Sequence, residues 1–212
     1  MSESNVGPGE FYQVVGVGPH SKPWPTDNHF DPELLEQGDR RNVLDKYRYW
    51  KLAAIVAELD TKRHDLQIAI ENWQHDLNIG SIVRTANAFN VSGVHIVGKR
   101  DWNKRGAMVT DRYLTVHHHP TVQDFAIWCK ENDLPIIGID NVPGSQQLES
   151  AQLPEKCVLL FGQEGAGMSD EGIAVCEVLY EINQYGSTRS MNASAAGAIA
   201  MYHWALQHLL VR

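Results

Sequence analysis

The chain has 212 residues, of which 43% are hydrophobic, and its formal net charge is −8. This length and hydrophobic content predict one folded domain of ordinary size with an extension. The acidic balance argues against indiscriminate binding to nucleic acid, although a local basic face is compatible with it.

The cysteines and the first residues predict a cytoplasmic protein. Cys129, Cys157 and Cys176 are widely spaced in apolar contexts, and no CxxC or Cys/His ligand spacing occurs. We therefore expect buried, reduced thiols and no bound metal. No apolar run approaches the roughly 18 residues of a membrane span, and residues 1–10 lack the basic and apolar regions of a signal peptide.

Charge divides the beginning of the chain into two segments. Residues 1–39 are rich in Gly, Pro, Asn and Asp and hold seven acidic residues against one lysine, so we expect a loosely ordered extension. Residues 40–64 start with five basic side chains before residue 52, and apolar residues then follow at helical spacing. This pattern predicts a helix over residues 42–61.

The basic part of that helix also contains Tyr47, Tyr49 and Trp50. One interpretation is an amphipathic helix that packs on the domain and leaves a basic face in solvent. The other is an RNA contact, in which Arg41 and Arg48 bind phosphates and the aromatic rings stack on bases. The residues alone leave both interpretations open.

A strand–helix–strand unit follows. We expect a strand over residues 66–70, a helix that begins near Asn78 or Ser81, and a second strand over residues 94–97. On this helix Arg84 lies two positions from an apolar residue on either side, so its side chain should leave the buried face. By itself, such an arginine is usually a surface charge, and Asn78 is usually a helix cap.

The loop after the second strand, residues 99–112, is basic and contains a tryptophan. Its cationic side chains include Lys99, Arg100, Lys104 and Arg105. Binding residues concentrate in loops that follow strands, so this loop is either an RNA contact or a plain solvated surface.

Strands and helices continue to alternate. Residues 113–117 are expected to form a short strand, residues 122–132 a helix, and residues 134–139 a strand that ends in a polar loop. Adjacent strand residues face opposite sides of a sheet, so the three histidines at 117–119 make a poor metal site. The alternation predicts an α/β fold with a mostly parallel sheet and helices on both faces.

Two further apolar runs, residues 157–161 and 178–182, have the character of buried parallel strands. A turn with three glycines, from Gly162 to Gly167, follows the first run, and a polar loop follows the second. The glycine spacing does not fit the G-x-G-x-x-G dinucleotide fingerprint. Polar and glycine-rich loops after two strands predict a ligand site at the carboxyl edge of the sheet.

Three segments together resemble a known family. Residues 78–89 (NIGSIVRTANAF), 161–169 (FGQEGAGMS) and 182–194 (INQYGSTRSMNAS) are similar to the three motifs of the SPOUT superfamily of RNA methyltransferases, in its TrmH-like (SpoU) branch. Their order and spacing agree with that family over roughly residues 65–210. Three positions depart from it: Asn183 stands where proline is usual, Met191 where leucine is usual, and Ala193 where valine is usual.

The resemblance implies an S-adenosylmethionine-dependent enzyme that methylates the 2′-oxygen of an RNA ribose, with tRNA favoured over rRNA. It implies a methyltransferase domain over residues 65–212, a deep trefoil knot near the C-terminus, and a homodimer with each site near the subunit interface. The small residues of the last helix fit close packing with a second subunit, although packing within one subunit would also need them.

The resemblance also implies roles for individual residues. Arg84 matches the arginine proposed to activate the ribose hydroxyl, either as a base or as an orienting charge. The other near-invariant polar positions are Asn78, Glu164, Ser190 and Asn192. The cofactor-binding positions are Gly162, Ile182 and Met191, and we expect Ile139 and Gly167 to complete that site. We expect Arg189, together with the basic residues named above, to contact RNA.

Two other function classes compete with this interpretation. One is a non-catalytic RNA-binding protein with the same knotted fold, and the intact polar positions of the motifs weigh against it. The other is a nucleotide-dependent α/β oxidoreductase. That class would need an early glycine fingerprint and a ribose-binding acid, and the sequence has neither.

Overall fold

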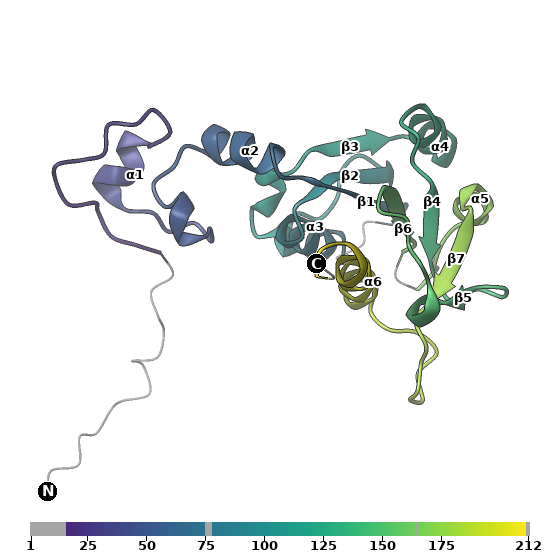
Figure 1. Ribbon diagram of the computed structural model, residues 1–212. Coiled ribbons are helices and arrows are strands. Elements are labelled where there is room, and N and C mark those ends of the chain that lie inside the picture. The colour runs from purple at the N-terminus through teal and green to yellow at the C-terminus, as the bar shows by residue number, and fades with distance from the viewer. Residues whose placement is uncertain (1–15, 75–77, 164, 211–212) are drawn as a thin grey trace, which may run out of the picture. The chain divides into compact units, whose positions relative to one another are not determined.

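The computed structural model describes residues 16–74, 78–163 and 165–210 (Figure 1). The chain divides into two compact units, Met1–Glu58 and Leu59–Arg212. The second unit contains the whole sheet and the cavity described below.

A buried carboxylate organises the first unit. Asp39 is completely buried and accepts hydrogen bonds from the backbone N–H groups of Arg41 (2.9 Å) and Tyr49 (3.0 Å) and from the Arg41 guanidinium (2.7 Å). Burial by itself raises the pKa of this carboxyl, but the hydrogen bonds from Arg41 and Tyr49 outweigh burial and lower the pKa to about 2. Helix α1 (Pro32–Gln37) precedes Asp39. Residues 16–39 of the expected loosely ordered extension thus contain this helix and a backbone bridge between Val17 and Asp39, and residues 1–15 lie outside the described residues.

The predicted helix over residues 42–61 is wrong in its first half. Only a short 3-10 helix, η1 (Asp45–Tyr47), forms there, and α2 begins later and spans Leu52–Asp60. Between them Tyr49 adopts a left-handed backbone conformation with φ of 64°, and Trp50 forms an antiparallel bridge. The hydrogen bond from Tyr49 N–H to the buried Asp39 takes the place of a helical hydrogen bond. The spacing of apolar residues, on which the prediction rested, contains no sign of this bond.

The second unit is built on a seven-stranded sheet in the order β3-β2-β1-β6-β4-β7-β5, in which all neighbouring strands are parallel. This confirms the α/β class with a mostly parallel sheet. The strands are β1 (His64–Asn72), β2 (Val91–Gly98), β3 (Val116–His119), β4 (Ile136–Ile139), β5 (Gln146–Gln147), β6 (Cys157–Phe161) and β7 (Val178–Glu181).

Most of these strands lie where the sequence predicted them. The third lies three residues late, because residues 110–113 form a 3-10 helix, η3 (Thr110–Tyr113), and not the start of a strand. Strand β5 was not predicted from sequence. It is two residues long and pairs only through Gln146 and Gln147, so it leaves no periodic pattern.

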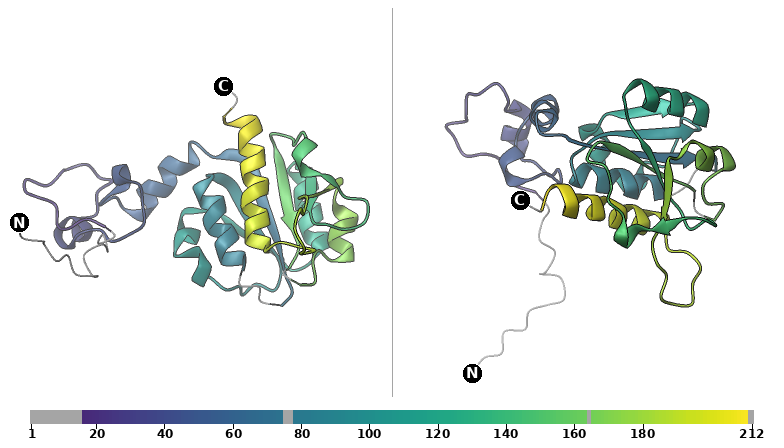
Figure 2. Two further views of the ribbon diagram at one scale, coloured as in Figure 1. Left: turned by 90° about the horizontal axis from the view of Figure 1, so that it is seen from below. Right: turned by 45° about the vertical axis from the view of Figure 1, so that its right-hand side comes forward.

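Helices cover both faces of the sheet, as expected. Helices α3 (Asn78–Ala88) and α6 (Ala193–His208) lie side by side on one face (Figure 2), and α4 (Val122–Glu131) and α5 (Asp170–Val175) lie on the other. Two more short 3-10 helices are η2 (Arg105–Ala107) and η4 (Leu148–Ser150). Within residues 16–74, 78–163 and 165–210, no helix combines the length and apolar character that crossing a bilayer requires.

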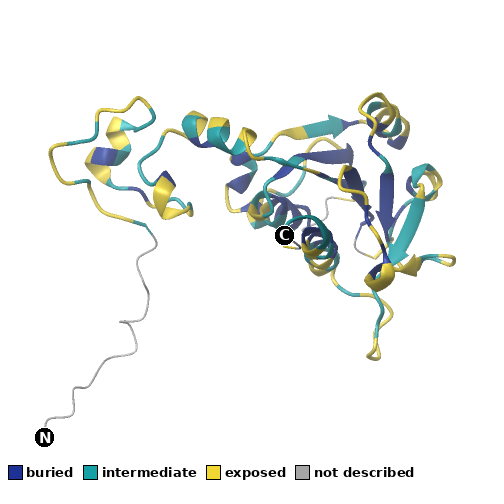
Figure 3. Ribbon diagram, in the orientation of Figure 1, coloured by how far each residue is buried: buried dark blue, intermediate teal, exposed yellow. Residues whose placement is uncertain are grey.

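Alternation along the strands builds two cores. In β1, Ile68 and Ile70 face the α3 and α6 layer, and Ala69 faces the α4 layer. Leu159 and Leu160 divide in the same way in the neighbouring β6. The central strands are buried on both faces (Figure 3), which explains why they read as continuous apolar runs.

A cluster of histidines is buried between the sheet and α4. His95 of β2 is completely buried, and its ring lies 2.9 Å from Nε2 of His119 and 2.6 Å from Oε1 of Gln67. The ring of His117 stacks on His95 with centroids 4.8 Å apart, whereas His118 points away and contacts the carbonyl oxygen of residue 98. Burial, and to a smaller extent the neighbouring rings of His117 and His119, lower the pKa of His95 to about 2, and burial also lowers the pKa of His117 and of His119. The cluster is therefore uncharged at neutral pH.

This cluster predicts acid sensitivity. The pKa of a histidine in an unfolded chain is near 6.5. Between about pH 6.5 and 2 the unfolded state therefore binds a proton that folded His95 does not. The free energy of unfolding falls as the pH falls through this window. At pH 5.5, His95 alone should lower the free energy of unfolding by about 1.4 kcal/mol relative to pH 7.5. Urea unfolding at both pH values should show that His95→Gln loses about this part of the pH dependence. His118→Gln, whose ring lies outside the cluster, should keep the wild-type dependence, and identical behaviour of the two variants would contradict the assignment.

Candidate functional site

Three segments meet at the carboxyl edge of the sheet and enclose a cavity of about 490 Å³. We call them the post-β4 loop (residues 139–142), the glycine loop (residues 161–168) and the post-β7 loop (residues 182–192). The wall of the cavity includes all five positions expected to hold a cofactor, which are Ile139, Gly162, Gly167, Ile182 and Met191. It also includes three of the expected polar residues, which are Arg189, Ser190 and Asn192.

The glycine loop has a backbone shape that side chains would prevent. A Cβ at Gly162 would lie 2.2 Å from the backbone nitrogen of Met168, which is far inside van der Waals contact. Gly167 has a φ of 72°, in the left-handed region that favours glycine. The turn is closed by two backbone hydrogen bonds between Gln163 and Gly167, at 3.0 and 2.9 Å. These glycines therefore shape the wall of the cavity.

The post-β4 loop contributes the carboxylate of Asp140 to the cavity wall. Its Oδ2 accepts a hydrogen bond from Met168 N–H at 2.7 Å, and its Oδ1 accepts one from Asn141 N–H at 2.8 Å. The sequence predicts a polar loop here, but neither Asp140 nor Asn141 was among the residues expected to form the site. The available signal was their position directly after a buried strand, where ligand sites of parallel sheets lie.

The post-β7 loop leads into α6 through an asparagine cap. Oδ1 of Asn192 accepts hydrogen bonds from the N–H groups of Ser194 (3.0 Å) and Ala195 (3.3 Å), and its Nδ2 donates to Oδ1 of Asn78 at 2.7 Å. Asn78 is buried at the beginning of α3. Two polar residues expected in the catalytic set thus contact each other and join the starts of α3 and α6.

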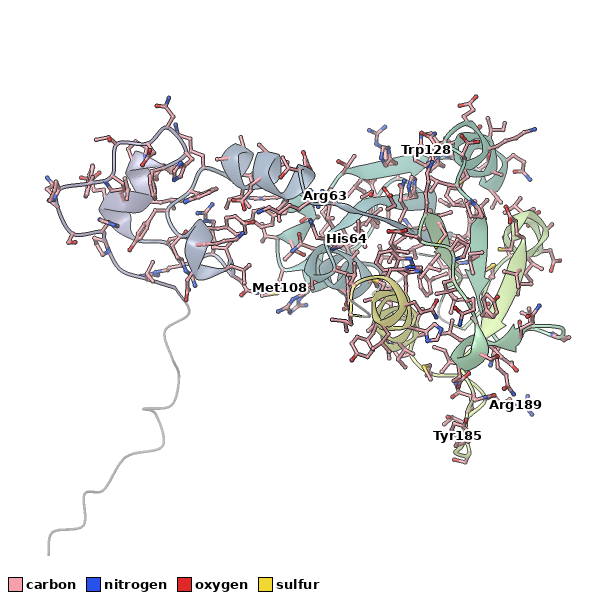
Figure 4. All side chains as sticks on the ribbon, in the orientation of Figure 1. Arg63, His64, Met108, Trp128, Tyr185 and Arg189 are labelled. Carbon is pink, nitrogen blue, oxygen red and sulfur yellow. The ribbon has the colours of Figure 1, made fainter. Side chains whose placement is uncertain are left out.

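The tip of the post-β7 loop is exposed. Tyr185 is 90% exposed, and Figure 4 shows it at the end of the loop with Arg189 nearby. Ser190 is also exposed, although it lines the cavity. This side of the cavity is therefore open to a large ligand.

Arg84 lies on α3 with an exposed side chain, as its spacing predicted. It is not part of the cavity wall of its own chain. The structure therefore does not bring Arg84 into the cavity within a single chain. Glu164, the remaining expected polar residue, lies outside the described residues.

The basic residues expected to bind RNA differ in their surroundings. In the first unit, the Arg41 guanidinium contacts Asp39, and that of Arg48 donates to the backbone oxygen of Arg41 at 2.6 Å. In the second unit Lys99, Arg100 and Arg105 are exposed, and Lys104 is exposed but pairs with Asp111 at 3.3 Å. The loop after β2 (residues 99–112) is thus better placed than the first unit to offer cationic groups to a ligand.

The cysteines are unsuited to nucleophilic chemistry. Burial raises the pKa of Cys129, Cys157 and Cys176 to about 12, so each thiol stays protonated at neutral pH. No disulfide joins them. In the part of the chain that the structure describes, no group of three or more His, Cys, Asp or Glu side chains is arranged to hold a metal ion.

The sequence matches relatives of known activity. It is 26% identical over 155 residues to "tRNA (guanosine(18)-2′-O)-methyltransferase" of Borreliella burgdorferi, which covers 72% of this chain and 71% of that protein. It is 27% identical over 195 residues to "tRNA (guanosine(18)-2′-O)-methyltransferase TARBP1" of mouse, over 84% of this chain and 12% of that protein. The mouse match exceeds the length of the second unit and therefore extends into the first.

Solved structures share the fold of the second unit. The SpoU methyltransferase AviRb from Streptomyces viridochromogenes has a TM-score of 0.64 and 24% identity, over 71% of this chain and 62% of that one. A TrmH/SpoU tRNA modifying enzyme of A. aeolicus also has a TM-score of 0.64, with 22% identity, over 74% of this chain and 83% of that one. At sequence identities below 25%, these similarities show a shared fold and carry no conclusion about activity.

The family model described as "SpoU rRNA Methylase family" matches residues 65–202, which is more than half of the chain. This match confirms the resemblance drawn from the three motifs and leaves no support for a nucleotide-dependent oxidoreductase. The chain belongs to the SpoU methylase family, the TrmH-like branch of the SPOUT RNA methyltransferases.

Proposed function

We propose that this protein transfers a methyl group from S-adenosylmethionine to the 2′-hydroxyl of a ribose in tRNA. The observation that supports the proposal most directly is that the glycine loop and the post-β7 loop line one shared cavity. These two loops hold two of the three family motifs. The relatives named as tRNA methyltransferases favour tRNA over rRNA as substrate. We expect the protein to act in the cytoplasm, where tRNA is available.

The cavity fits the cofactor in size and character. Its volume of about 490 Å³ lies within the usual range for small-molecule sites. Backbone of Gly162, Ile182 and Met191 would hold the cofactor, with Ile139 and Gly167 completing the wall. Main-chain donors and acceptors do not depend on side-chain identity, so the unusual Met191 is compatible with this role. When bound, S-adenosylmethionine supplies a methyl group on a sulfonium that is already positively charged.

Arg84 is proposed to act on the ribose and its phosphate. A ribose hydroxyl is a very weak acid, and a guanidinium keeps its proton at physiological pH. Arg84 therefore orients the phosphate and hydroxyl and stabilises the developing negative charge, rather than removing the proton. The hydroxyl proton would pass to solvent water as the methyl group bonds to the oxygen, and S-adenosylhomocysteine would be the leaving group. Ser190 and Glu164 are proposed as further polar groups of this site. Asn78 and Asn192 support it by joining α3 to the post-β7 loop.

A homodimer would explain the position of Arg84 outside its own cavity. Ile199, Tyr202 and Leu206 of α6 are 42%, 51% and 39% exposed, and their spacing places them on one face of the helix. Burial of this face by a second copy would remove apolar surface from water. We propose that α6 contributes to the dimer interface and that Arg84 of one subunit serves the cavity of the other.

The deep trefoil knot is also part of the proposal. The chain leaves β7, on one side of β4, and returns to place α6 beside α3 on the β1 side of the sheet. On the way the post-β7 loop passes the post-β4 loop, where Asn141 donates a hydrogen bond to the backbone oxygen of Arg189. This crossing supports threading of the C-terminal segment, a rare exception to the rule that chains are unknotted.

Cofactor binding should depend on the glycine loop. Calorimetric titration of the pure protein should show binding of S-adenosylhomocysteine, and Gly162→Ala should weaken it by about tenfold or more, because the added Cβ overlaps Met168. Gly186→Ala is the matched control, because a Cβ there meets no atom within 4 Å. Equal affinities of the two variants would contradict the cavity assignment, and no binding to the wild type would overturn the proposed function.

Arg84→Ala should abolish methyl transfer without unfolding the protein. Its side chain is exposed, so the free energy of unfolding should change by less than about 0.5 kcal/mol, whereas turnover should fall on the order of 10²-fold or more. The assay is single-turnover methylation of unmodified tRNA, with rRNA fragments for comparison, together with thermal melting and cofactor titration. Near-normal turnover would remove Arg84 from the mechanism.

The same variant tests the dimer. If Arg84 acts across the interface, mixing Arg84→Ala with Gly162→Ala should restore methylation at a cofactor concentration too low for the weakened Gly162→Ala cavity to fill, because some dimers combine an intact cavity with an intact arginine from the other subunit. If Arg84 acts within its own subunit, those mixed dimers stay inactive.

The loop after β2 should contact RNA phosphates. Replacing Lys104 and Arg105 with Gln should weaken tRNA binding. It should also reduce the salt slope, which is the slope of log affinity against log salt concentration, by about 1 for each phosphate that the variant no longer binds. Lys130→Gln, on α4 and on the other face of the sheet, is the control and should leave the slope unchanged. An unchanged slope in the double variant would show that the loop is only a solvated surface.

A further inference from the structure

Asp140 and Asn141, directly after β4, contact both of the other cavity loops. The Asp140 carboxylate accepts from Met168 N–H in the glycine loop at 2.7 Å. The Asn141 side-chain amide donates to the backbone oxygen of Arg189 in the post-β7 loop. Two adjacent residues therefore connect all three segments of the cavity wall, and neither belongs to the family motifs quoted above.

The carboxylate suits its position because both of its oxygens face backbone donors. Oδ1 accepts from Asn141 N–H at 2.8 Å and Oδ2 from Met168 N–H. A Cβ at Gly167 would lie 3.0 Å from Oδ2, so the glycine permits the close approach of the carboxylate. An amide in place of the carboxylate would direct an N–H₂ group at one of these two donors.

Among the described residues, few other contacts anchor the exposed part of the post-β7 loop. Asn183 N–H donates to Glu149 at 3.2 Å near its beginning, and Asn192 caps α6 at its end. Between these points Tyr185 is 90% exposed. The bond from Asn141 to Arg189 therefore restrains the part of the loop that faces a large ligand.

We infer that Asp140 and Asn141 are positioning residues that couple cofactor binding to RNA binding. A cofactor in the cavity contacts the post-β4 and glycine loops and orders Asp140. Asn141 transmits that order to Arg189, in the loop that meets the ribose-phosphate chain of the RNA. The inference rests on the proposed function, and by linkage the effect is reciprocal, so RNA strengthens cofactor binding by the same factor.

The first test needs no ligand. Hydrogen exchange of the free protein should show faster exchange in the glycine loop for Asp140→Asn and in residues 183–191 for Asn141→Ala, because each variant loses a different bond. Ser145→Ala is the control, since Ser145 Oγ donates to the backbone oxygen of Asp140 at 2.9 Å but contacts neither of the other loops. Unchanged exchange in both variants would overturn the inference.

The second test measures the coupling. The Kd of unmodified tRNA is determined with and without saturating S-adenosylhomocysteine, and the Kd of S-adenosylhomocysteine with and without tRNA. Wild type and Ser145→Ala should show equal enhancement in both directions, by about fivefold. Asn141→Ala should lose the enhancement, which is a ratio of Kd values and therefore does not depend on the affinity of the variant for S-adenosylhomocysteine in the absence of RNA. Asp140→Asn should lose about fivefold in that affinity as well, as expected for one hydrogen bond.

The outcomes separate the inference from the proposed function. Coupling that survives Asn141→Ala would overturn the inference alone, because the wild type would still bind both ligands. Wild-type protein that binds neither S-adenosylhomocysteine nor tRNA would overturn the proposed function and the coupling together.

Discussion

The close approach of Gly162 to the backbone of Gly167 and Met168 is the constraint on which the cavity depends. A Cβ at Gly162 would come within 2.6 Å of three atoms of those residues. The glycine loop can therefore fold back beside β6 only without a side chain there. That fold brings Met168 N–H to Asp140, and Asn141 then holds the post-β7 loop. One steric requirement thus underlies the arrangement of all three loops.

The polar residues of the motifs divide into two kinds. Asn78 and Asn192 bond to each other, and Asn192 also caps α6, so they explain how α3 and α6 start side by side. Arg84 and Ser190 are exposed and are available to a ligand. Residues that are grouped in a motif therefore need not share a task. A substitution at Asn78 would disturb packing, whereas one at Arg84 would leave packing intact.

A protein with a net charge of −8 must bind RNA through local fields. The basic residues of the first unit are largely engaged within it, because Arg41 contacts the buried Asp39 and Arg48 contacts the backbone of Arg41. The loop after β2 keeps exposed cationic groups, and Arg189 stands at the cavity. The exposed cationic groups proposed to meet the phosphate chain therefore lie in the second unit, where the cavity lies.

The sequence by itself determined the α/β class, most strand positions and many of the residues that line the cavity. Buried parallel strands leave continuous apolar runs, and glycines and polar residues mark the loops that follow them. It did not determine the boundaries of α2, since the Tyr49 N–H bonds to Asp39 rather than within a helix. Nor did it identify the histidine cluster around His95 or the links through Asp140 and Asn141. Those contacts join residues 24 or more positions apart, so only the tertiary structure, which sets the register and crossing of distant strands, could decide them.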